Sequence, residues 1–148
     1  MSTKLAEPAV SLGNLGFLLA KASQRFNERL LERLAEQGFV EVRASYGSVL
    51  TPLFEQDHLR VGEIGARARL SKQAMTRLVA QCVADGLVRR SRDAADGRAF
   101  RVALTSRGQE LRSVVQRVLA QLDNEVLAQV GRRDIDALKT ALKGVMEL

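Results

Sequence analysis

Apolar residues recur at helical spacing near the start of the chain. Between residues 11 and 37 they follow i, i+3, i+4 spacing: Leu15, Leu18, Leu19, Ala22, Phe26, Leu30, Leu31 and Leu34. Arginines and glutamates occupy the intervening positions, so this segment predicts an amphipathic helix after a short tail that ends near Pro8. A second helix is predicted from about Ala44 to Gln56, with a kink or an early start at Pro52.

Two shorter helical patterns come next, joined by a tight turn. The first is predicted over Val61–Ala68, and the turn falls at Arg69-Leu70. Ser71 is suited to cap a second helix, which runs to about Asp85 and stops at Gly86. The inner face of this second helix is apolar: Ala74, Met75, Leu78, Val79, Cys82 and Val83. Its outer face is polar: Lys72, Gln73, Thr76, Arg77 and Gln81. Two short helices joined by a tight turn form a helix-turn-helix pattern.

The spacing then changes from the helical period to strand-like alternation. Two strands are predicted over Leu87–Arg92 and Ala99–Leu104, with Asp93–Arg98 as the connecting loop. Helix, turn, helix and hairpin, in that order, make a winged helix.

Helical spacing returns after the second strand. Thr105 or Ser106 is expected to cap a long helix that reaches about Gln129, and Ser106 and Gln109 stand at capping-box spacing. Gly131 is expected to break this helix. The last helix has apolar positions at Ile135, Leu138, Leu142 and Val145.

These elements predict one domain over residues 1–148. We expect a mainly helical fold with a small β-hairpin wing: a winged helix-turn-helix lobe over 38–104, flanked by dimerisation helices over 1–37 and 105–148. The flanking helices carry more apolar residues than a small winged-helix core can cover. A two-fold homodimer would bury them and set two DNA-reading helices about 34–36 Å apart, which suits a pseudo-palindromic site.

The positive charge is concentrated in one third of the chain. Between Arg60 and Gly108 there are 11 Lys/Arg against 4 Asp/Glu, whereas the other residues hold 12 against 13. A basic segment beside neutral flanks indicates a polyanionic partner. Nucleic acid is the leading candidate and an acidic membrane surface the second, and the winged-helix pattern suits double-stranded DNA in particular.

Composition argues against several other classes of protein. The single cysteine, Cys82, and the single histidine, His58, allow no intrachain disulfide and no usual metal site. We interpret Cys82 as a small buried hydrophobe, with redox sensing as the alternative. No catalytic residues, cofactor site or metal site emerge from the sequence, so the protein is not expected to be an enzyme. The sequence has neither a membrane span nor a signal-peptide core, which predicts a cytoplasmic protein.

The candidate DNA-binding residues lie on the second helix of the helix-turn-helix and on the wing. Ser71, Lys72, Gln73, Thr76 and Arg77 occupy the first two helical turns, where recognition helices meet base edges in the major groove. The alternative is an ordinary solvated helix face. On the wing, Arg98 suits the narrow minor groove. Arg92, with Arg89 and Arg90, suits phosphates. Asp96 is expected to hold the Arg98 guanidinium in a bidentate pair, the alternative being a weak surface ion pair.

The segments SKQAMTRLV, DGLVRR, RDAADGR and VALTSRG resemble the multiple-antibiotic-resistance regulator (MarR) family of bacterial transcription factors. The most specific part is D-x-R followed by an alternating strand that ends in L-T-x-x-G. The resemblance covers nearly the whole chain. It implies an obligate homodimer, a recognition helix in the major groove and a wing arginine in the minor groove. It also implies release from DNA by oxidation or by a small, often aromatic or phenolic, ligand.

Two positions depart from the family pattern. Gly65 stands where alanine is usual and would permit closer helix packing, at some cost in helix stability. Arg69 stands where the turn usually has glycine, which puts the turn geometry in question, although the arginine is a candidate phosphate contact. The reactive cysteine that oxidation-sensing members keep near the N-terminus has no counterpart here.

Few residues in the sequence are candidates for binding an effector. The only tyrosine, Tyr46, falls in the region where family members bind ligands, so it is a candidate ligand residue for a small aromatic or anionic effector. The alternative is that Tyr46 packs and hydrogen-bonds a neighbour. Arg25 and Arg43 are weaker candidates. Two other functions stay open: sequence-independent DNA packaging, and a winged helix that docks proteins.

Overall fold

The computed structural model describes residues 12–148. The tail expected to end near Pro8, and the first residue of the helix expected over 11–37, lie outside the described residues. The elements in chain order are α1 (Leu15–Glu36), a 3-10 turn η1 (Ala44–Tyr46), α2 (Gly47–Glu55), β1 (Leu59–Arg60), α3 (Val61–Ala68), α4 (Lys72–Ala84), β2 (Val88–Arg92), β3 (Phe100–Leu104), α5 (Ser106–Val130) and α6 (Arg132–Val145). The mainly helical winged-helix fold is therefore confirmed.

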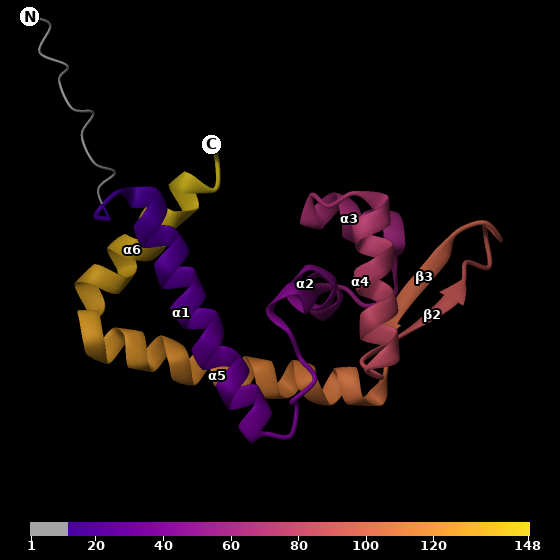
Figure 1. Cartoon of the computed structure of the whole chain (residues 1–148), viewed down its shortest axis with the longest axis horizontal. Helices are drawn as coiled ribbons and strands as arrows, with labels where there is room; N and C mark the ends of the chain where they lie inside the picture. Colours follow the sequence, from indigo (N-terminus) through magenta and orange to yellow (C-terminus); the bar gives the residue numbers. More distant parts are fainter. Residues whose placement is uncertain (1–11) are drawn as a thin grey trace, which may run out of the picture.

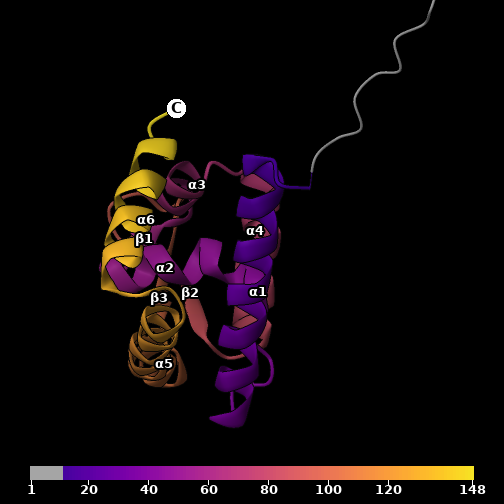
Figure 2. The same ribbon diagram turned by 90° about the vertical axis from the view of Figure 1, so that its left-hand side faces the viewer.

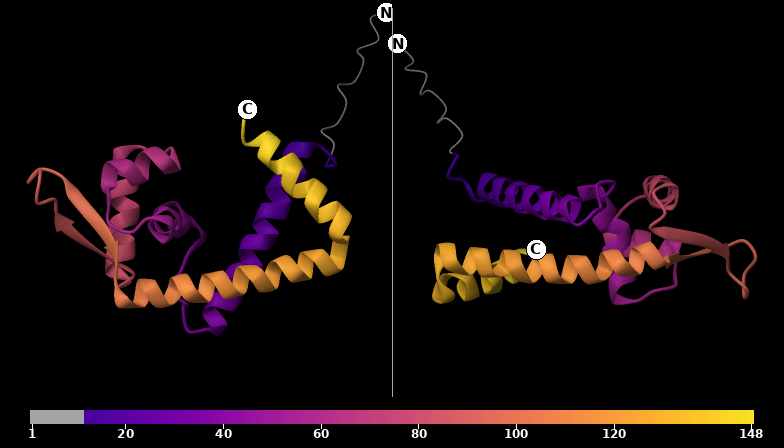
Figure 3. Two further views of the ribbon diagram at one scale, coloured as in Figure 1. Left: turned by 180° about the vertical axis from the view of Figure 1, so that it is seen from behind. Right: turned by 90° about the horizontal axis from the view of Figure 1, so that it is seen from below.

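The molecule is elongated, with its long helices at one end and its hairpin at the other. Helix α1 crosses α5, which carries the chain away from the hairpin, and α6 turns back at the far end (Figure 1). Seen from the side, α1 and α6 lie in different layers (Figure 2). The β2–β3 hairpin projects well beyond the helical lobe (Figure 3).

One hydrophobic core joins α2, α3, α4, the sheet and the first half of α5. Val49, Ile64, Met75, Leu87 and Leu111 are all fully buried in it. Helix α1 joins this core only through its C-terminal half: Leu34 is buried, whereas Leu15 and Leu18 stay 61% and 53% exposed. The apolar stripe of α1 that the sequence predicts is therefore uncovered at its N-terminal end.

The hairpin belongs to a three-stranded antiparallel sheet in the order β1-β3-β2. Strand β1, which the sequence analysis missed, pairs Leu59 with Val102 and Arg60 with Arg101. Strands β2 and β3 pair from Val88↔Leu104 out to Arg92↔Phe100. A strand of two residues has no room for an alternating pattern, which is why it left no signal in the sequence.

The start of α5 corrects one prediction. Thr105 is the cap: its Oγ1 accepts from the Gly108 amide at 3.1 Å and donates to the Gly86 carbonyl at 2.6 Å. The capping box expected from Ser106 and Gln109 does not form, because the Gln109 side chain donates to Asp57 Oδ2 instead. A Cβ on Gly108 would lie 2.2 Å from the Leu87 carbonyl oxygen, so the glycine lets α5 pack directly against the end of the helix-turn-helix.

Candidate nucleic-acid interface

The second helix of the helix-turn-helix, α4, is fixed by apolar packing. Met75, Val79 and Cys82 are fully buried on its inner face, as their helical spacing predicts. Val83, expected on the same face, is 40% exposed, so that prediction was wrong. Gly86, at φ +74, ends the helix, with the Leu87 amide donating to the Cys82 carbonyl.

The outer face of α4 presents the predicted contact residues to solvent. Ser71 is the N-cap, and its Oγ accepts from the Ala74 amide at 3.1 Å. Lys72, Gln73, Thr76 and Arg77 are all exposed. The Thr76 hydroxyl donates to the Lys72 carbonyl at 2.8 Å, so it faces any ligand as an acceptor with a methyl group beside it. These polar side chains therefore gather on the first two turns of the helix.

The turn before α4 keeps its geometry although it lacks the usual glycine. Arg69 takes the left-handed conformation at φ 53 and ψ 40, ends α3, and is exposed. That conformation costs roughly 1 kcal/mol for a residue with a Cβ. Gly65 is not required for packing, because an added Cβ would meet its nearest neighbours at 3.6 Å, an ordinary contact. The expectation that Gly65 permits closer packing was wrong.

The wing loop between β2 and β3 is ordered by its own hydrogen bonds. The Asp93 amide donates to the Ala99 carbonyl at 2.9 Å, and the Ala99 amide to the Asp96 carbonyl at 3.0 Å. Arg92 Nη1 donates to the Gly97 carbonyl at 3.2 Å. The loop is therefore a shaped tip that displays Arg98.

Asp96 acts on the backbone of Arg98 and not on its guanidinium. Asp96 Oδ1 accepts from the Arg98 amide at 3.0 Å, and no ion pair joins the two side chains among residues 12–148. The expected bidentate pair is therefore wrong. A carboxylate that reaches an amide two residues ahead forms an Asx turn, which shapes the loop and leaves the guanidinium free to extend.

The charged group that the sequence analysis missed is Asp93. It is the one buried polar or charged residue of the part that the structure describes, 4% exposed. Its Oδ2 lies 2.7 Å from Arg60 Nε and 3.4 Å from Arg101 Nε, and its Oδ1 accepts from the Ala95 amide at 3.0 Å. The hydrogen bond from the Ala95 amide, and then the charges of Arg101 and Arg60, lower the pKa of this carboxyl. No local pattern marks Asp93, because Arg60 is far from it in the chain.

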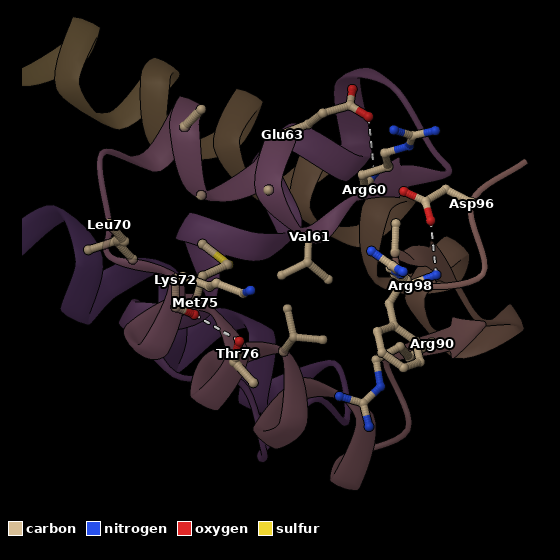
Figure 4. A pocket seen from close by; sticks show the side chains of 16 residues that line it. Arg60, Val61, Glu63, Leu70, Lys72, Met75, Thr76, Arg90, Asp96 and Arg98 are labelled. Atoms are coloured by element: carbon tan, nitrogen blue, oxygen red, sulfur yellow. Dashed lines mark hydrogen bonds between the residues drawn. The ribbon is translucent and has the colours of Figure 1, made fainter. Parts of the chain in front are cut away.

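A hollow of about 790 Å³ lies between α3, α4 and the wing. Lys72 from α4 and Arg98 from the wing both point into it (Figure 4). Its floor includes the apolar side chains of Val61 and Met75. At its wing side Phe100 is 39% exposed, and the Arg90 guanidinium lies over its ring at 5.0 Å. The hollow thus has an apolar floor and a mostly cationic rim.

Tyr46 is packed in the core and lines neither this hollow nor the smaller cavity between α1, α2 and α5. It is 1% exposed, and its hydroxyl donates to Asp85 at the C-terminal end of α4. Burial, and then the neighbouring Asp85 carboxylate, raise the pKa of Tyr46 to about 12. The packing alternative therefore describes Tyr46, and its candidate role as a ligand residue is not supported.

A second, smaller cavity of about 180 Å³ lies between α1, α2 and α5. Its lining is mainly apolar and includes Leu31, Leu50 and Leu111, with Arg43 as its one cationic residue. Arg25, the other weak candidate for an anionic effector, is absent from this lining and pairs with Glu28 at 3.4 Å. Of the residues considered for an effector, only Arg43 borders the cavity.

Burial, and then the charge of Asp85, raise the pKa of the Cys82 thiol to about 12, so this cysteine is set for packing rather than for thiolate chemistry. Within residues 12–148 no cluster of three His, Cys, Asp or Glu side chains could hold a metal ion. No helix in that range is long and apolar enough to cross a membrane.

The chain is similar in sequence to known transcriptional regulators. The profile of the MarR family matches residues 54–99, which hold α3, α4 and most of the wing. An HTH-type transcriptional regulator of Mycobacterium tuberculosis is 31% identical over 100 residues, covering 68% of this chain and 70% of the relative.

Solved structures share the fold over nearly the whole chain. The transcriptional repressor CouR, bound to a 23-mer DNA duplex, superposes with a TM-score of 0.78 at 22% identity, covering 94% of this chain and 99% of that one. The regulator PcaV of Streptomyces coelicolor, in complex with its natural ligand, gives 0.76 at 21% identity, covering 95% and 98%.

Proposed function

This chain belongs to the MarR family of winged helix-turn-helix transcription regulators, and we propose that it acts as a homodimeric repressor that binds a pseudo-palindromic operator and releases it when a small ligand binds. The observation that carries this proposal is the hollow between α4 and the wing. Its rim is mainly cationic, and two of the three elements that border it, α4 and the wing, are the ones expected to read DNA.

The geometry of B-DNA supports this use of the hollow. A helix in the major groove and a wing in the adjacent minor groove must straddle one sugar–phosphate strand. That strand would pass over the hollow, where Lys72, Arg90 and Arg98 form the rim. The exposed apolar ring of Phe100 would meet sugar carbons there, while the guanidinium stacked on it meets a phosphate.

Each candidate residue has a role that follows from its chemistry. Gln73 suits a bidentate contact with adenine, and Arg77 or Lys72 suits guanine or a phosphate. Arg98 at the wing tip enters the minor groove, where a narrow A·T tract attracts a guanidinium. Arg92 and Arg69 contact phosphates. Ser71, whose Oγ accepts from the Ala74 amide, leaves the amides of Lys72 and Gln73 to face a phosphate as well.

The exposed surface of the chain supports a homodimer. Large apolar side chains at both ends of the described chain stay open to solvent: Leu12, Leu15, Phe17, Leu18, Leu138, Met146 and Leu148. Soluble monomers rarely leave so many together. A second copy that covers α1 and α6 would bury them.

The smaller cavity supports release by a ligand. An apolar cavity of about 150 Å³ is enough to bind benzene, so about 180 Å³ suits a single aromatic ring. Arg43 at its border would pair with a carboxylate or phenolate on that ring. The cavity lies between the helices of the dimer end and α2 of the DNA-binding lobe, so a ligand there could change how the two are placed.

Fluorescence anisotropy tests DNA reading directly. The protein is titrated with duplex DNA taken from upstream of its own gene and with a scrambled duplex of equal composition, at several salt concentrations. We expect the upstream duplex to bind at least about 10³-fold more tightly, with both affinities falling as salt rises. Equal affinity for the two duplexes would instead identify a sequence-independent DNA-binding protein.

The effector is tested on the same complex. Benzoate should release the operator, while benzyl alcohol, which has the ring without the charge, should release it far less. Arg43→Ala should remove the difference between the two compounds without changing DNA affinity in their absence. Arg25→Ala is the matched control, because Arg25 lies outside the cavity. If benzoate acts equally on wild type and Arg43→Ala, the cavity is not its site.

A further inference from the structure

The wing loses its apolar support well before its tip. On β2 only Val88 is buried, and Arg89–Arg92 are exposed. On β3 burial ends at Val102, with Arg101 half-buried and Phe100 exposed. The two-residue strand β1 reaches only as far as Arg101. The outer part of the hairpin therefore extends beyond the hydrophobic core.

Asp93 is the buried group that supports this outer part. It follows the last residue of β2, and its carboxylate lies between Arg60 and Arg101 at 2.7 and 3.4 Å. Neither contact is an aligned hydrogen bond, so the link is an ion pair shared by two guanidinium groups. Arg101 also donates to the His58 carbonyl at 2.9 Å, which ties the same cluster to the segment before β1.

Arg60 connects this cluster to the helix-turn-helix. It is the N-cap of α3, and its amide donates to Glu63 Oε1 at 3.3 Å. Helix α3 in turn packs on α4. One end of the Asp93–Arg60 pair thus lies in the wing loop, and the other lies where β1 meets the first helix of the helix-turn-helix. The remaining hydrogen bonds of the loop stay within the wing, so they shape the tip without fixing its direction.

We propose that Asp93 is a positioning residue for DNA reading: its buried carboxylate, held between Arg60 of the helix-turn-helix and Arg101 of β3, sets the direction of the wing relative to α4. Arg98 then meets the minor groove while α4 occupies the adjacent major groove. This role rests on the DNA-binding function proposed above. A carboxylate is needed for it, because an amide of the same shape cannot compensate two guanidinium charges.

Asp93→Asn is the variant that tests this role. It keeps the acceptor for the Ala95 amide and the shape of the side chain, and it removes the charge. Glu55→Gln is the matched control, because it removes one negative charge of the same lobe, beside Arg67 of α3, at a residue that does not line the hollow. Both variants gain the same +1 charge, so nonspecific attraction to DNA rises equally in the two.

Two readouts separate positioning from a general loss of structure. In hydrogen–deuterium exchange without DNA, the backbone amides of residues 88–100 should exchange faster in Asp93→Asn than in wild type. The exchange rates of the α4 amides should be unchanged. In anisotropy titrations, the same variant should lose about tenfold of the preference for the upstream duplex over the scrambled one, while Glu55→Gln keeps that preference. Affinity for the scrambled duplex should not fall in either variant.

Three results would overturn the proposal. Unchanged exchange in the wing would mean that Asp93 does not anchor it. Faster exchange with an unchanged preference would mean that the anchor has no part in DNA reading. Equal losses on both duplexes together with faster exchange in α4 would indicate a purely structural role. If wild type itself shows no preference, the proposed regulator function and the DNA-reading role fail together, and the exchange data still decide separately whether Asp93 anchors the wing.

Discussion

The two elements that face the proposed DNA surface are held in place by different kinds of interaction. Helix α4 rests on the fully buried side chains of Met75, Val79 and Cys82. The outer wing rests on one buried carboxylate between two guanidinium groups and on hydrogen bonds within its own loop. Apolar packing is close to rigid and insensitive to salt, whereas an ion pair at the edge of the core depends on charge and on solvent access.

This difference suits the two grooves. Base edges in the major groove demand a helix placed to within a fraction of an ångström, because bidentate contacts fail when misaligned. The minor groove varies in width with sequence, so a wing on an ionic anchor can follow it. The predictions below change one support at a time.

The largest effect is expected from the apolar support. Met75→Ala removes a fully buried side chain and should lower the free energy of unfolding by about 2–5 kcal/mol. Urea denaturation followed by circular dichroism measures it. Gln73→Ala, on the exposed side of the same helix, should stay within about 0.5 kcal/mol of wild type. A loss below about 1 kcal/mol for Met75→Ala would mean that α4 is not held by this packing.

The pH dependence of stability should differ in direction between the apolar support of α4 and the ionic support of the wing. Burial raises the pKa values of Cys82 and Tyr46 to about 12, so the unfolded chain loses these protons first, from about pH 8.5 and about pH 10. The protonated forms of Cys82 and Tyr46 therefore stabilise the fold fully below those unfolded-state pKa values. This contribution declines as the pH rises toward 12. The lowered pKa of Asp93 acts oppositely: its contribution is complete above about pH 4 and is lost as the pH falls.

One measurement tests the alkaline range and another tests the acidic range. The melting temperature should fall between pH 9 and 11, measured by circular dichroism, and less steeply in Tyr46→Phe. The chain has no tryptophan, so Ala94→Trp gives a reporter in the wing loop whose anisotropy should drop in acid before the helical signal does. A wing reporter that changes only together with global unfolding would remove the distinction between the supports.

The wing arginine and the recognition helix should differ in what they contribute to DNA binding. Arg98→Ala should weaken the upstream duplex by about 10–100-fold and reduce the salt slope by about one. Gln73→Ala should mainly change base preference, by about 1–3 kcal/mol. Anisotropy titrations on single-base operator variants measure both. If neither substitution alters binding, the DNA surface lies elsewhere on the molecule.

How much of this was accessible from sequence depends on the range of each interaction. The inner face of α4 was predictable because helical spacing records it locally, and so was the Ser71 cap. The Asp93 cluster was not, since its partners Arg60 and Arg101 lie on other strands. Spacing also could not reveal that Asp96 bonds an amide instead of a guanidinium.

Tyr46 illustrates the same limit. Its partner Asp85 closes α4, far along the chain, so the sequence could not decide between packing and ligand binding. Strand β1 was missed because a strand of two residues is too short to show an alternating pattern. The fold class was nevertheless predictable, because the patterns that indicate its helices and hairpin each lie within about a dozen residues.

The smallest effect is expected at the turn that joins α3 and α4. Arg69 holds a left-handed backbone at φ 53, so Arg69→Gly should stabilise the fold by about 0.5–1 kcal/mol. The same change removes a phosphate contact and should weaken both duplexes alike, lowering the salt slope by about one. Denaturation measures the expected gain in stability, and titration of the same sample with DNA measures the expected loss of affinity. A variant both more stable and equally tight on DNA would show that Arg69 does not touch a phosphate.

Dimethyl sulfate footprinting tests the central claim most directly, because the reagent methylates guanine N7 in the major groove and adenine N3 in the minor groove. Wild type should protect guanines in two major-groove half-sites about 10 base pairs apart and adenines in the adjoining minor grooves. Arg98→Ala should lose the adenine protection and keep the guanine protection. Loss of both together, or of neither, would contradict the assignment of α4 and the wing to separate grooves.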